Sequence, residues 1–337
     1  MFRFLHKIVL ACTVIVVVSS CNKLPVVEPI ITNPATNTVA DVINNTATYS
    51  ILKAAVTKAG LLPTLSRSGT SYTVFAPDDA AFIASGIPAA AINALDAATL
   101  RSILSYHVIP QAIPASGIPT TFPNVQMPTL LSLSPPLVSM SIFPSRRGSQ
   151  AWVNNIPIAQ TDIAVSNGVI HRVAAVVSPP NALLKQLVNS DTALTFLRAA
   201  IARADSGQVG LNRFDSAMNF AVANLTIFAP TNNAFRTTLG IPDSSVFSSL
   251  PVLTVRGIVA YHLLGSRAFS VNLPTTTTTV ATLLGAAPFP GITFDYSTGG
   301  LKLKGAANGP ALFNVITANR NAVNGVLHTI DGVLRPQ

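Results

Sequence analysis

Histidines are the first side chains of this sequence to consider for chemistry. Four of the five histidines form two matched pairs of positions, His107 with His262 and His171 with His328. A metal site needs three or four converging ligands, usually with a closely spaced pair such as HxxxH or CxxC, and neither spacing occurs. One core hydrogen bond can satisfy each histidine, so we expect a structural role, no metal and no cofactor. A divalent metal or a pH switch is the alternative.

Catalytic motifs are scarce. There is no GxSxG nucleophile elbow and no glycine-rich phosphate loop, and the single glutamate, Glu28, stands in a proline-punctuated stretch. Adjacent carboxylates occur at Asp78-Asp79, directly after a strand-like run, where capping of a helix is a better interpretation than catalysis. The sequence therefore predicts a protein that is not an enzyme.

The charge pattern argues against nucleic-acid binding. The formal net charge of +9 arises from 21 basic and only 12 acidic residues, and charged residues make up 10% of the chain. The basic residues are scattered, and the one adjacent arginine pair is Arg146-Arg147. Phosphate binding needs positive charge gathered on one face, so we expect no nucleic-acid partner.

The N-terminus has the pattern of a secretory signal. Arg3 and Lys7 precede an apolar run over residues 8–18, which is too short for a transmembrane helix. The run ends in Val-Ser-Ser-Cys, which resembles a bacterial lipoprotein lipobox and implies cleavage before Cys21 and lipidation of that cysteine. An ordinary signal peptide with an incidental cysteine, or an uncleaved anchor, is the alternative.

Cysteine usage agrees with this hypothesis, because Cys12 and Cys21 are the only cysteines and Cys12 lies inside the signal. We therefore expect a lipoprotein signal peptide over residues 1–20, a proline-punctuated tether over residues 21–40 and domains held by packing alone. The expected location is the cell envelope, lipid-anchored at the outer membrane and facing either the periplasm or the outside.

The remaining chain is a duplication. YTVFAPDDAAF at residues 72–82 reappears as LTIFAPTNNAF at residues 225–235, and three further landmarks repeat in the same order at nearly constant separation. Such spacing indicates a duplicated domain, not a short-period solenoid. With Pro179-Pro180 as the boundary, we expect one domain over residues 41–180 and another over residues 181–337.

Each copy predicts the same local structure. Apolar residues at helical spacing predict a helix over about residues 51–62 and another over about residues 194–204. The β-prone runs 73–76 and 226–229 each stop at a proline, which cannot donate to a continuing ladder. Four polar side chains follow them as candidate helix caps, and two phenylalanines can then pin the new helix to the sheet. The caps are Asp78 or Asp79 and Thr231 or Asn232; the phenylalanines are Phe82 and Phe235.

The end of each copy predicts a hairpin. Asn167-Gly168 and Asn324-Gly325 are flanked by alternating apolar residues, and Asn-Gly is a strong signal for a type I′ turn. His171 and His328 then share a face with β-branched neighbours, so we expect both to point toward the core.

These motifs together resemble tandem fasciclin (FAS1) domains. The family's TVFAPTNxAF motif matches residues 73–82 and 226–235, its central Tyr-His follows in each copy, and its closing motif appears as NGVIHRVAAVV and NGVLHTIDGVL. Asp78-Asp79 replaces the usual Thr-Asn, and Ala174 stands where the second copy has Asp331. The resemblance implies an α+β fold of two tandem domains, each a wedge-shaped β-sandwich decorated with helices.

The resemblance also supplies a candidate adhesion motif. In animal relatives a tyrosine-histidine segment is assigned to integrin binding, and its counterparts here are Tyr106, His107, Tyr261 and His262. Each pair follows an apolar, helix-like run, so burial is the competing interpretation and the one that we favour.

Family members are secreted or surface-anchored and act in adhesion. The resemblance, together with the lipobox-like motif, thus implies a lipid-anchored cell-envelope module, fixed in the membrane through its N-terminal lipid, that presents two domains to matrix, glycan or neighbouring-cell partners. Two weak sites on one chain would gain avidity. The alternatives are a structural subunit docking on another envelope protein complex, and an enzyme with an unrecognised site.

Overall fold

The computed structural model describes residues 36–133, 138–285, 290–296 and 300–336, all of which belong to one compact unit, Pro34–Gln337. The predicted signal peptide and the lipidation site Cys21 lie outside the described residues. Within the described residues, no helix combines the length and the apolar character that crossing a membrane would require.

Three helices of the first domain precede its first strand, and three more lie between that strand and the next. The helices are α1 (Val39–Asn45), α2 (Ser50–Lys58), α3 (Leu62–Leu65), α4 (Asp79–Ala84), α5 (Ala89–Ala94) and α6 (Ala97–Tyr106), with short 3₁₀ turns η1 (Ala47–Tyr49) and η2 (Ala115–Gly117). α1 starts inside the predicted tether, because Thr38 caps it in a capping box with Asp41 and because Val39 is fully buried.

The sheet of the first domain closes the domain by pairing its first long strand with its last. Its order is β2-β1-β8-β7-β6-β5, with β1 and β8 parallel and the other pairs antiparallel, and β3 and β4 form a separate two-stranded sheet. The strands are β1 (Tyr72–Pro77), β2 (Val108–Ile109), β3 (Met127–Leu133), β4 (Val138–Ile142), β5 (Pro144–Arg147), β6 (Gln150–Val153), β7 (Ile156–Val165) and β8 (Gly168–Val173).

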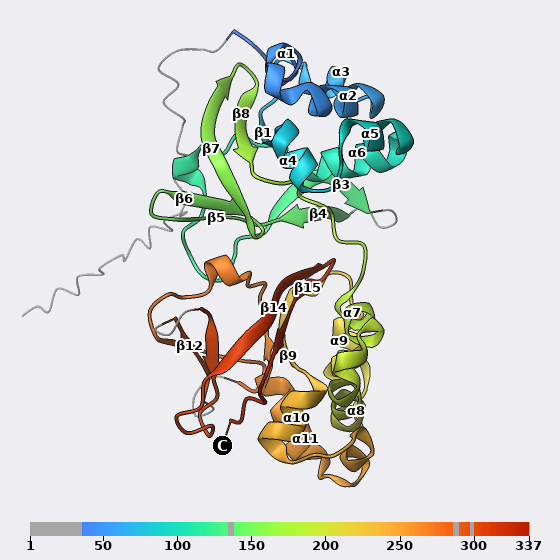
Figure 1. Ribbon diagram of the computed structural model, residues 1–337, viewed down its shortest axis with the longest axis vertical. Helices are drawn as coiled ribbons and strands as arrows, with labels where there is room; N and C mark the ends of the chain where they lie inside the picture. The colour runs from blue at the N-terminus through green and yellow to red at the C-terminus, as the bar shows by residue number, and fades with distance from the viewer. Residues whose placement is uncertain (1–35, 134–137, 286–289, 297–299, 337) are drawn as a thin grey trace, which may run out of the picture. The chain divides into compact units, whose positions relative to one another are not determined.

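The second domain repeats this plan (Figure 1). Its sheet order, β10-β9-β15-β14-β13-β12-β11, again places the first long strand parallel to the last. Its strands are β9 (Leu225–Pro230), β10 (Leu263–Leu264), β11 (Thr278–Val280), β12 (Ile292–Asp295), β13 (Lys302–Lys304), β14 (Phe313–Ala322) and β15 (Gly325–Ile330). Its helices are α7 (Leu184–Ser190), α8 (Thr195–Ala204), α9 (Phe214–Met218), α10 (Asn232–Leu239) and α11 (Val252–Tyr261), with 3₁₀ turns η3 (Thr192–Leu194), η4 (Gly210–Asn212), η5 (Ser244–Ser249) and η6 (Ser270–Asn272).

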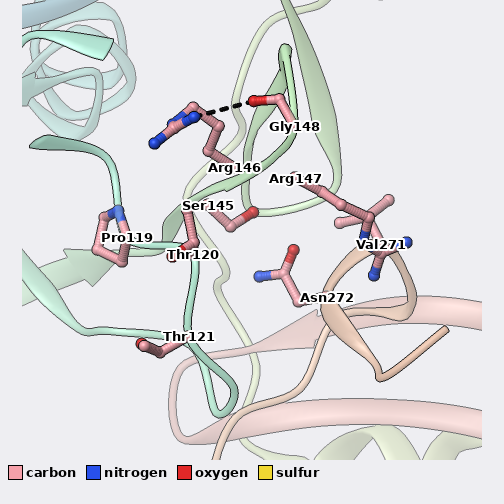
Figure 2. Close-up of a pocket in the computed structure, with 9 residues that line it drawn as sticks. All are labelled: Pro119, Thr120, Thr121, Ser145, Arg146, Arg147, Gly148, Val271 and Asn272. Carbon is pink, nitrogen blue, oxygen red and sulfur yellow. Dashed lines mark hydrogen bonds between the residues drawn. The ribbon is translucent and has the colours of Figure 1, made fainter. Parts of the chain in front are cut away.

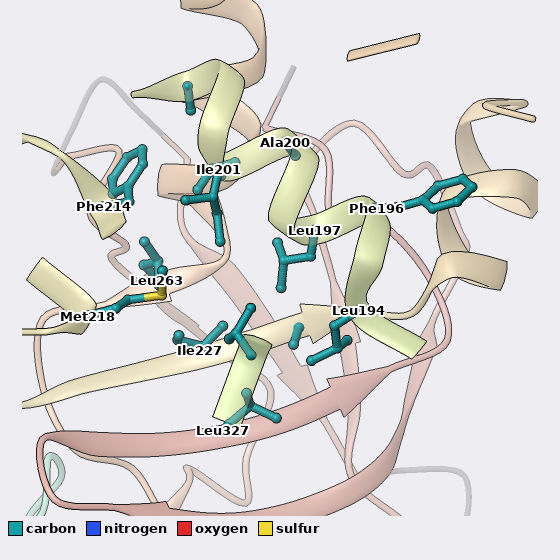
Figure 3. Packing of buried hydrophobic residues seen from close by; sticks show 14 of the residues in the cluster. Leu194, Phe196, Leu197, Ala200, Ile201, Phe214, Met218, Ile227, Leu263 and Leu327 are labelled. Carbon is teal, nitrogen blue, oxygen red and sulfur yellow. The ribbon is translucent and has the colours of Figure 1, made fainter. Parts of the chain in front are cut away.

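The predicted helices and strands are present, but the helix expected over residues 51–62 ends at Lys58, and the separate short helix α3 begins at Leu62. α2 buries Ile51, Leu52, Ala55 and Val56, the apolar positions of the predicted stripe. In the second domain, side chains of α8 and α9 face Ile227 of β9 and Leu327 of β15 across one core, as Figure 3 shows. Burying a leucine or isoleucine of this kind contributes about 1.5–3 kcal/mol, so these stripes anchor the helices to the sheets.

The predicted type I′ hairpin turns are wrong. In the strand register Val165 pairs with Gly168, so the two-residue loop is Ser166-Asn167, and neither residue has the positive φ that a type I′ turn requires. Gly168 is needed for another reason: a Cβ on it would lie 1.9 Å from the backbone oxygen of Tyr72 on the parallel neighbour β1. Gly325 repeats this close approach, at 2.2 Å from the backbone oxygen of Leu225.

We therefore predict that Gly168→Ala destabilises the protein strongly, by at least ~3 kcal/mol in the free energy of unfolding measured by urea titration, because backbone atoms must move. Gly257→Ala is the matched control. Gly257 lies inside helix α11, and the nearest atom to an added Cβ is Leu284 Cδ1 at 3.9 Å. That substitution should stabilise the protein by about 0.5–1 kcal/mol. Similar stabilities for the two variants would contradict this account of the parallel pair.

Candidate functional site

The repeated strand-to-helix motif is a structural joint with two distinct polar contacts. Asp78 and Thr231 are the helix caps, since the Asp78 carboxylate accepts from Ala81 N at 2.8 Å and the Thr231 hydroxyl accepts from Ala234 N at 3.2 Å. The carboxylate of Asp78 also pairs with Arg172 of β8 at 3.0 Å, an ion pair that Thr231 cannot make. Asp78, which stands where the family motif has threonine, therefore still caps the following helix.

The next residue of the motif joins two helices. Asp79 Oδ1 accepts from Ile51 N at the start of α2 at 2.8 Å, and Asn232 Oδ1 accepts from Phe196 N at the start of α8 at 2.9 Å. N–H groups in the first turn of a helix have no partner within the helix itself, and each of these side chains supplies an acceptor for one of them. The paired carboxylates Asp78 and Asp79 thus have separate structural partners.

All four matched histidines are buried, and both ring nitrogens of each have a partner. His107 donates from Nδ1 to Ile103 O at 2.8 Å and accepts at Nε2 from Val177 N at 2.9 Å. His262 makes the same two contacts in the second domain, with Ile258 O and Leu334 N. Each ring therefore tethers the chain after the last strand to a helix end, as a neutral imidazole.

The second histidine of each domain lies in the closing strand. His171 donates from Nε2 to Ile113 O at 2.9 Å, and His328 donates to Ala268 O at 2.9 Å. Each ring also contacts the phenylalanine of the FAP motif on the parallel neighbour strand, with ring centroids 5.7 Å apart for Phe75–His171 and 5.3 Å apart for Phe228–His328. The predicted inward orientation is confirmed, and it links the first and last motifs of each copy.

The candidate adhesion residues are interior as well. Tyr106, His107, Tyr261 and His262 are at most 2% exposed. The Tyr106 hydroxyl donates to Ser141 O at 3.0 Å, and the Tyr261 hydroxyl donates to Gly291 O at 2.5 Å. An adhesive role for these segments stays a prediction; in the folded domains their side chains hold a helix against a strand or loop.

Two asparagines carry a role that sequence reasoning missed. Asn167 accepts from Val39 N at 2.9 Å and donates to Leu65 O at 2.8 Å, so it ties α1 and the end of α3 to the β7–β8 hairpin. Asn324 repeats this with Leu184 N at 2.9 Å and Met218 O at 2.8 Å. The sequence feature that marks both asparagines is the Asn-Gly pair, which by itself indicates a turn and not this tie between helices and hairpin.

No group of three or more histidine, cysteine or acidic side chains that could hold a metal occurs among the described residues. Three of the five buried side-chain atoms without a partner in the described part of the chain belong to residues that line a cavity of about 200 Å³, shown in Figure 2. Three segments line it: residues 119–121 after η2, residues 145–148 at the end of β5, and residues 271–272 in η6. Segments of both domains therefore line the cavity, and the pair Arg146-Arg147 was the feature of the sequence that pointed to it.

Polar atoms without partners gather in this cavity. Ser145 Oγ, Arg146 Nε and Asn272 Nδ2 are buried atoms that make no hydrogen bond to any described residue, and the Ser145 residue is 6% exposed. Among the residues that the structure describes, the one hydrogen-bond partner of the Arg147 side chain is a carbonyl, Leu273 O, at 2.8 Å. A buried polar atom without a partner is costly, so this concentration of them marks a candidate binding site.

Contacts beside the cavity join the two domains. The Arg267 guanidinium lies over the ring of Phe143, 4.5 Å from its centroid, and Phe143 also contacts Phe269 at 6.0 Å. Phe269 N donates to Asn124 Oδ1 at 3.3 Å. These contacts place β5 next to η6, so both sides of the cavity are held by packed aromatic rings.

The buried histidines should make the stability of the protein depend on pH. Burial lowers the pKa of His107, His262 and His328 from 6.5 to about 4. An unfolded chain binds protons at these groups near pH 6.5, whereas the folded chain does so near pH 4. Stabilisation is therefore complete above about pH 6.5 and is lost as the pH falls toward 4.

We predict that the free energy of unfolding falls between pH 6.5 and 4 by about 1.4 kcal/mol per pH unit for each such histidine, measured by urea titration at several pH values. The aspartates with lowered pKa, Asp41, Asp96 and Asp243, act below this window, because their pKa values lie below 3.8. His262→Gln should lower the free energy of unfolding at pH 7. It should also reduce the slope of that free energy against pH by the contribution of one proton, about 1.4 kcal/mol per pH unit. A flat profile for the unsubstituted protein over this range would exclude neutral buried histidines.

Comparisons with known proteins agree with this architecture. Residues 47–179 and 206–336 each match the Fasciclin domain. The chain is 37% identical over 149 residues to Transforming growth factor-beta-induced protein ig-h3 of Sus scrofa, which covers 44% of this chain and 20% of that protein. It is 33% identical over 147 residues to Protein sll1483 of Synechocystis, covering 42% of this chain and 74% of that protein.

A third relative is Cell surface glycolipoprotein MPB83 of Mycobacterium bovis, 32% identical over 115 residues, which are 34% of this chain and 46% of that protein. Among solved structures, a FAS1 domain pair from the insect cell adhesion molecule Fasciclin I is 17% identical with a TM-score of 0.38, covering 87% of this chain and 94% of that one. The chain spans only about a fifth of the length of the ig-h3 relative. With both copies matched over most of its length, the chain belongs to the fasciclin family and carries two Fasciclin domains in tandem.

Proposed function

We propose that this protein is a non-enzymatic adhesion module, anchored in the cell envelope by a lipid on Cys21, that presents two Fasciclin domains to a matrix or glycan partner. The observation that carries this proposal is that the polar side chains of the repeated motifs serve to hold the fold together. Their histidines, tyrosines, aspartates and asparagines all have partners inside the fold, which leaves recognition to the loops that differ between the copies.

The relatives support the surface location. MPB83 is named a cell surface glycolipoprotein, and a lipid on Cys21 would give this chain a comparable attachment. Two or three acyl chains anchor a protein stably, whereas one is marginal. We propose that the lipid inserts in the outer membrane. The segment before Thr38, which caps the first helix, would serve as the tether.

The anchor has a direct test. Cys21→Ser should abolish incorporation of a labelled fatty acid and release the protein from the membrane fraction, because the only other cysteine, Cys12, lies within the predicted signal. Cys12→Ser is the matched control and should leave labelling and fractionation unchanged. Labelling that persists in the Cys21 variant would remove the lipid from the proposal while leaving the binding function open.

The binding function has a separate test. The soluble chain from Asn22 to Gln337 should bind saturably to at least one member of an array of glycans and matrix proteins, with weaker binding at higher salt if the contact is ionic. A blank array together with one stoichiometric envelope partner in a pull-down from solubilised membranes would favour a docking subunit instead.

A further inference from the structure

We propose that the cavity between the β5–β6 turn and η6 binds an acidic sugar, a uronic acid residue of an anionic glycan. This inference rests on the proposed adhesion function and names the chemical class of its ligand. It places recognition at a site to which both domains contribute, since Val271 and Asn272 of the second domain line the cavity together with residues of the first.

The first argument is the donor inventory. The unpartnered atoms Arg146 Nε and Asn272 Nδ2 can only donate hydrogen bonds, and the unpartnered Ser145 hydroxyl can donate one. Figure 2 shows the Asn272 amide directed into the space beside Ser145 and Thr120. Such an arrangement selects a ligand rich in acceptor oxygens, and carboxylate and sugar hydroxyl oxygens meet that requirement.

The second argument is charge. Arg146 and Arg147 bond only carbonyl oxygens, those of Gly148 at 2.9 Å and Leu273 at 2.8 Å, and neither pairs with a carboxylate among the described residues. No aspartate or glutamate is among the described residues that line the cavity. Two uncompensated guanidinium groups favour an anion, and arginine in particular suits the planar geometry of a carboxylate.

The third argument is size and access. The cavity holds about 200 Å³, the volume of several water molecules, which suits one sugar ring with neighbouring residues of the glycan leaving through the opening. Thr120, Thr121, Arg147 and Gly148 are exposed at its rim, so a polymer can reach it from solvent. An inorganic anion would satisfy the charge but would leave part of the donor set unpaired.

The test uses the soluble chain from Asn22 and a polyuronate oligosaccharide titrated by calorimetry. Asn272→Asp replaces a donor by a carboxylate at nearly the same size and should weaken binding at least ~10-fold. Asn219→Asp, on the exposed end of α9, makes the same charge change away from the cavity and should leave binding unchanged. Arg147→Gln should weaken binding and reduce its dependence on salt.

Several outcomes would overturn the proposal. Equal binding of a neutral oligosaccharide would remove the role of charge, and complete competition by millimolar sulfate or phosphate would reduce the cavity to a simple anion site. Binding to another array ligand that Asn272→Asp leaves intact would refute the cavity as the recognition site while preserving the adhesion function. Conversely, polyuronate binding without retention of cells or matrix would preserve the cavity and refute adhesion.

Discussion

The parallel pairing of the first and last long strands is the constraint on which each domain depends. Tyr72 of β1 opposes Gly168 of β8, and Leu225 of β9 opposes Gly325 of β15, at distances that no side chain on the glycine would permit. That approach puts the preceding asparagine within reach of the N-terminal helix of its domain. It also places the histidine of the closing strand beside the phenylalanine of the FAP motif.

The repeated motifs therefore encode closure of the fold, and function must be sought where the copies differ. The first copy extends its sheet with β6 and β5, whereas the second extends its sheet with β13, β12 and β11. Arg146 and Arg147 stand on β5 in the first copy, and Asn272 stands on η6 in the second. Duplication thus supplies two unlike surfaces whose junction can be a site, in addition to any avidity from two separate contacts.

Local patterns in the sequence predicted much of this fold. The helical stripe from Ile51, the strand that ends at Pro77 and the inward orientation of His171 follow from side-chain period and from the missing amide of proline. The turn at Ser166-Asn167 could not be predicted in the same way. Its conformation is set by Tyr72 on a strand far away in sequence, and local propensity contains no information about that neighbour.

The cavity escaped prediction for a related reason. Ser145 lies on β5 and Asn272 on η6, in different domains and far apart in sequence, so no spacing rule joins them. Arg146-Arg147 was visible as a pair, yet its significance depends on what it faces. The scarcity of acids in the composition gave a general hint, since basic side chains in such a chain must often find carbonyls or ligands in place of carboxylates.

Arg267 shows how the junction can stay fixed while the cavity stays available for an anion. Its guanidinium is buried, which lowers its pKa to about 10, and it donates to Asn224, Asn321, Ala322 and Val323 of its own domain while presenting its face to Phe143 of the other. The charge is retained at neutral pH, because that pKa is still far above 7. A desolvated cation–π contact is screened little by salt, whereas an anion at the open cavity is screened strongly. We therefore expect higher ionic strength to weaken binding of the proposed anion at the cavity without separating the two domains that line it.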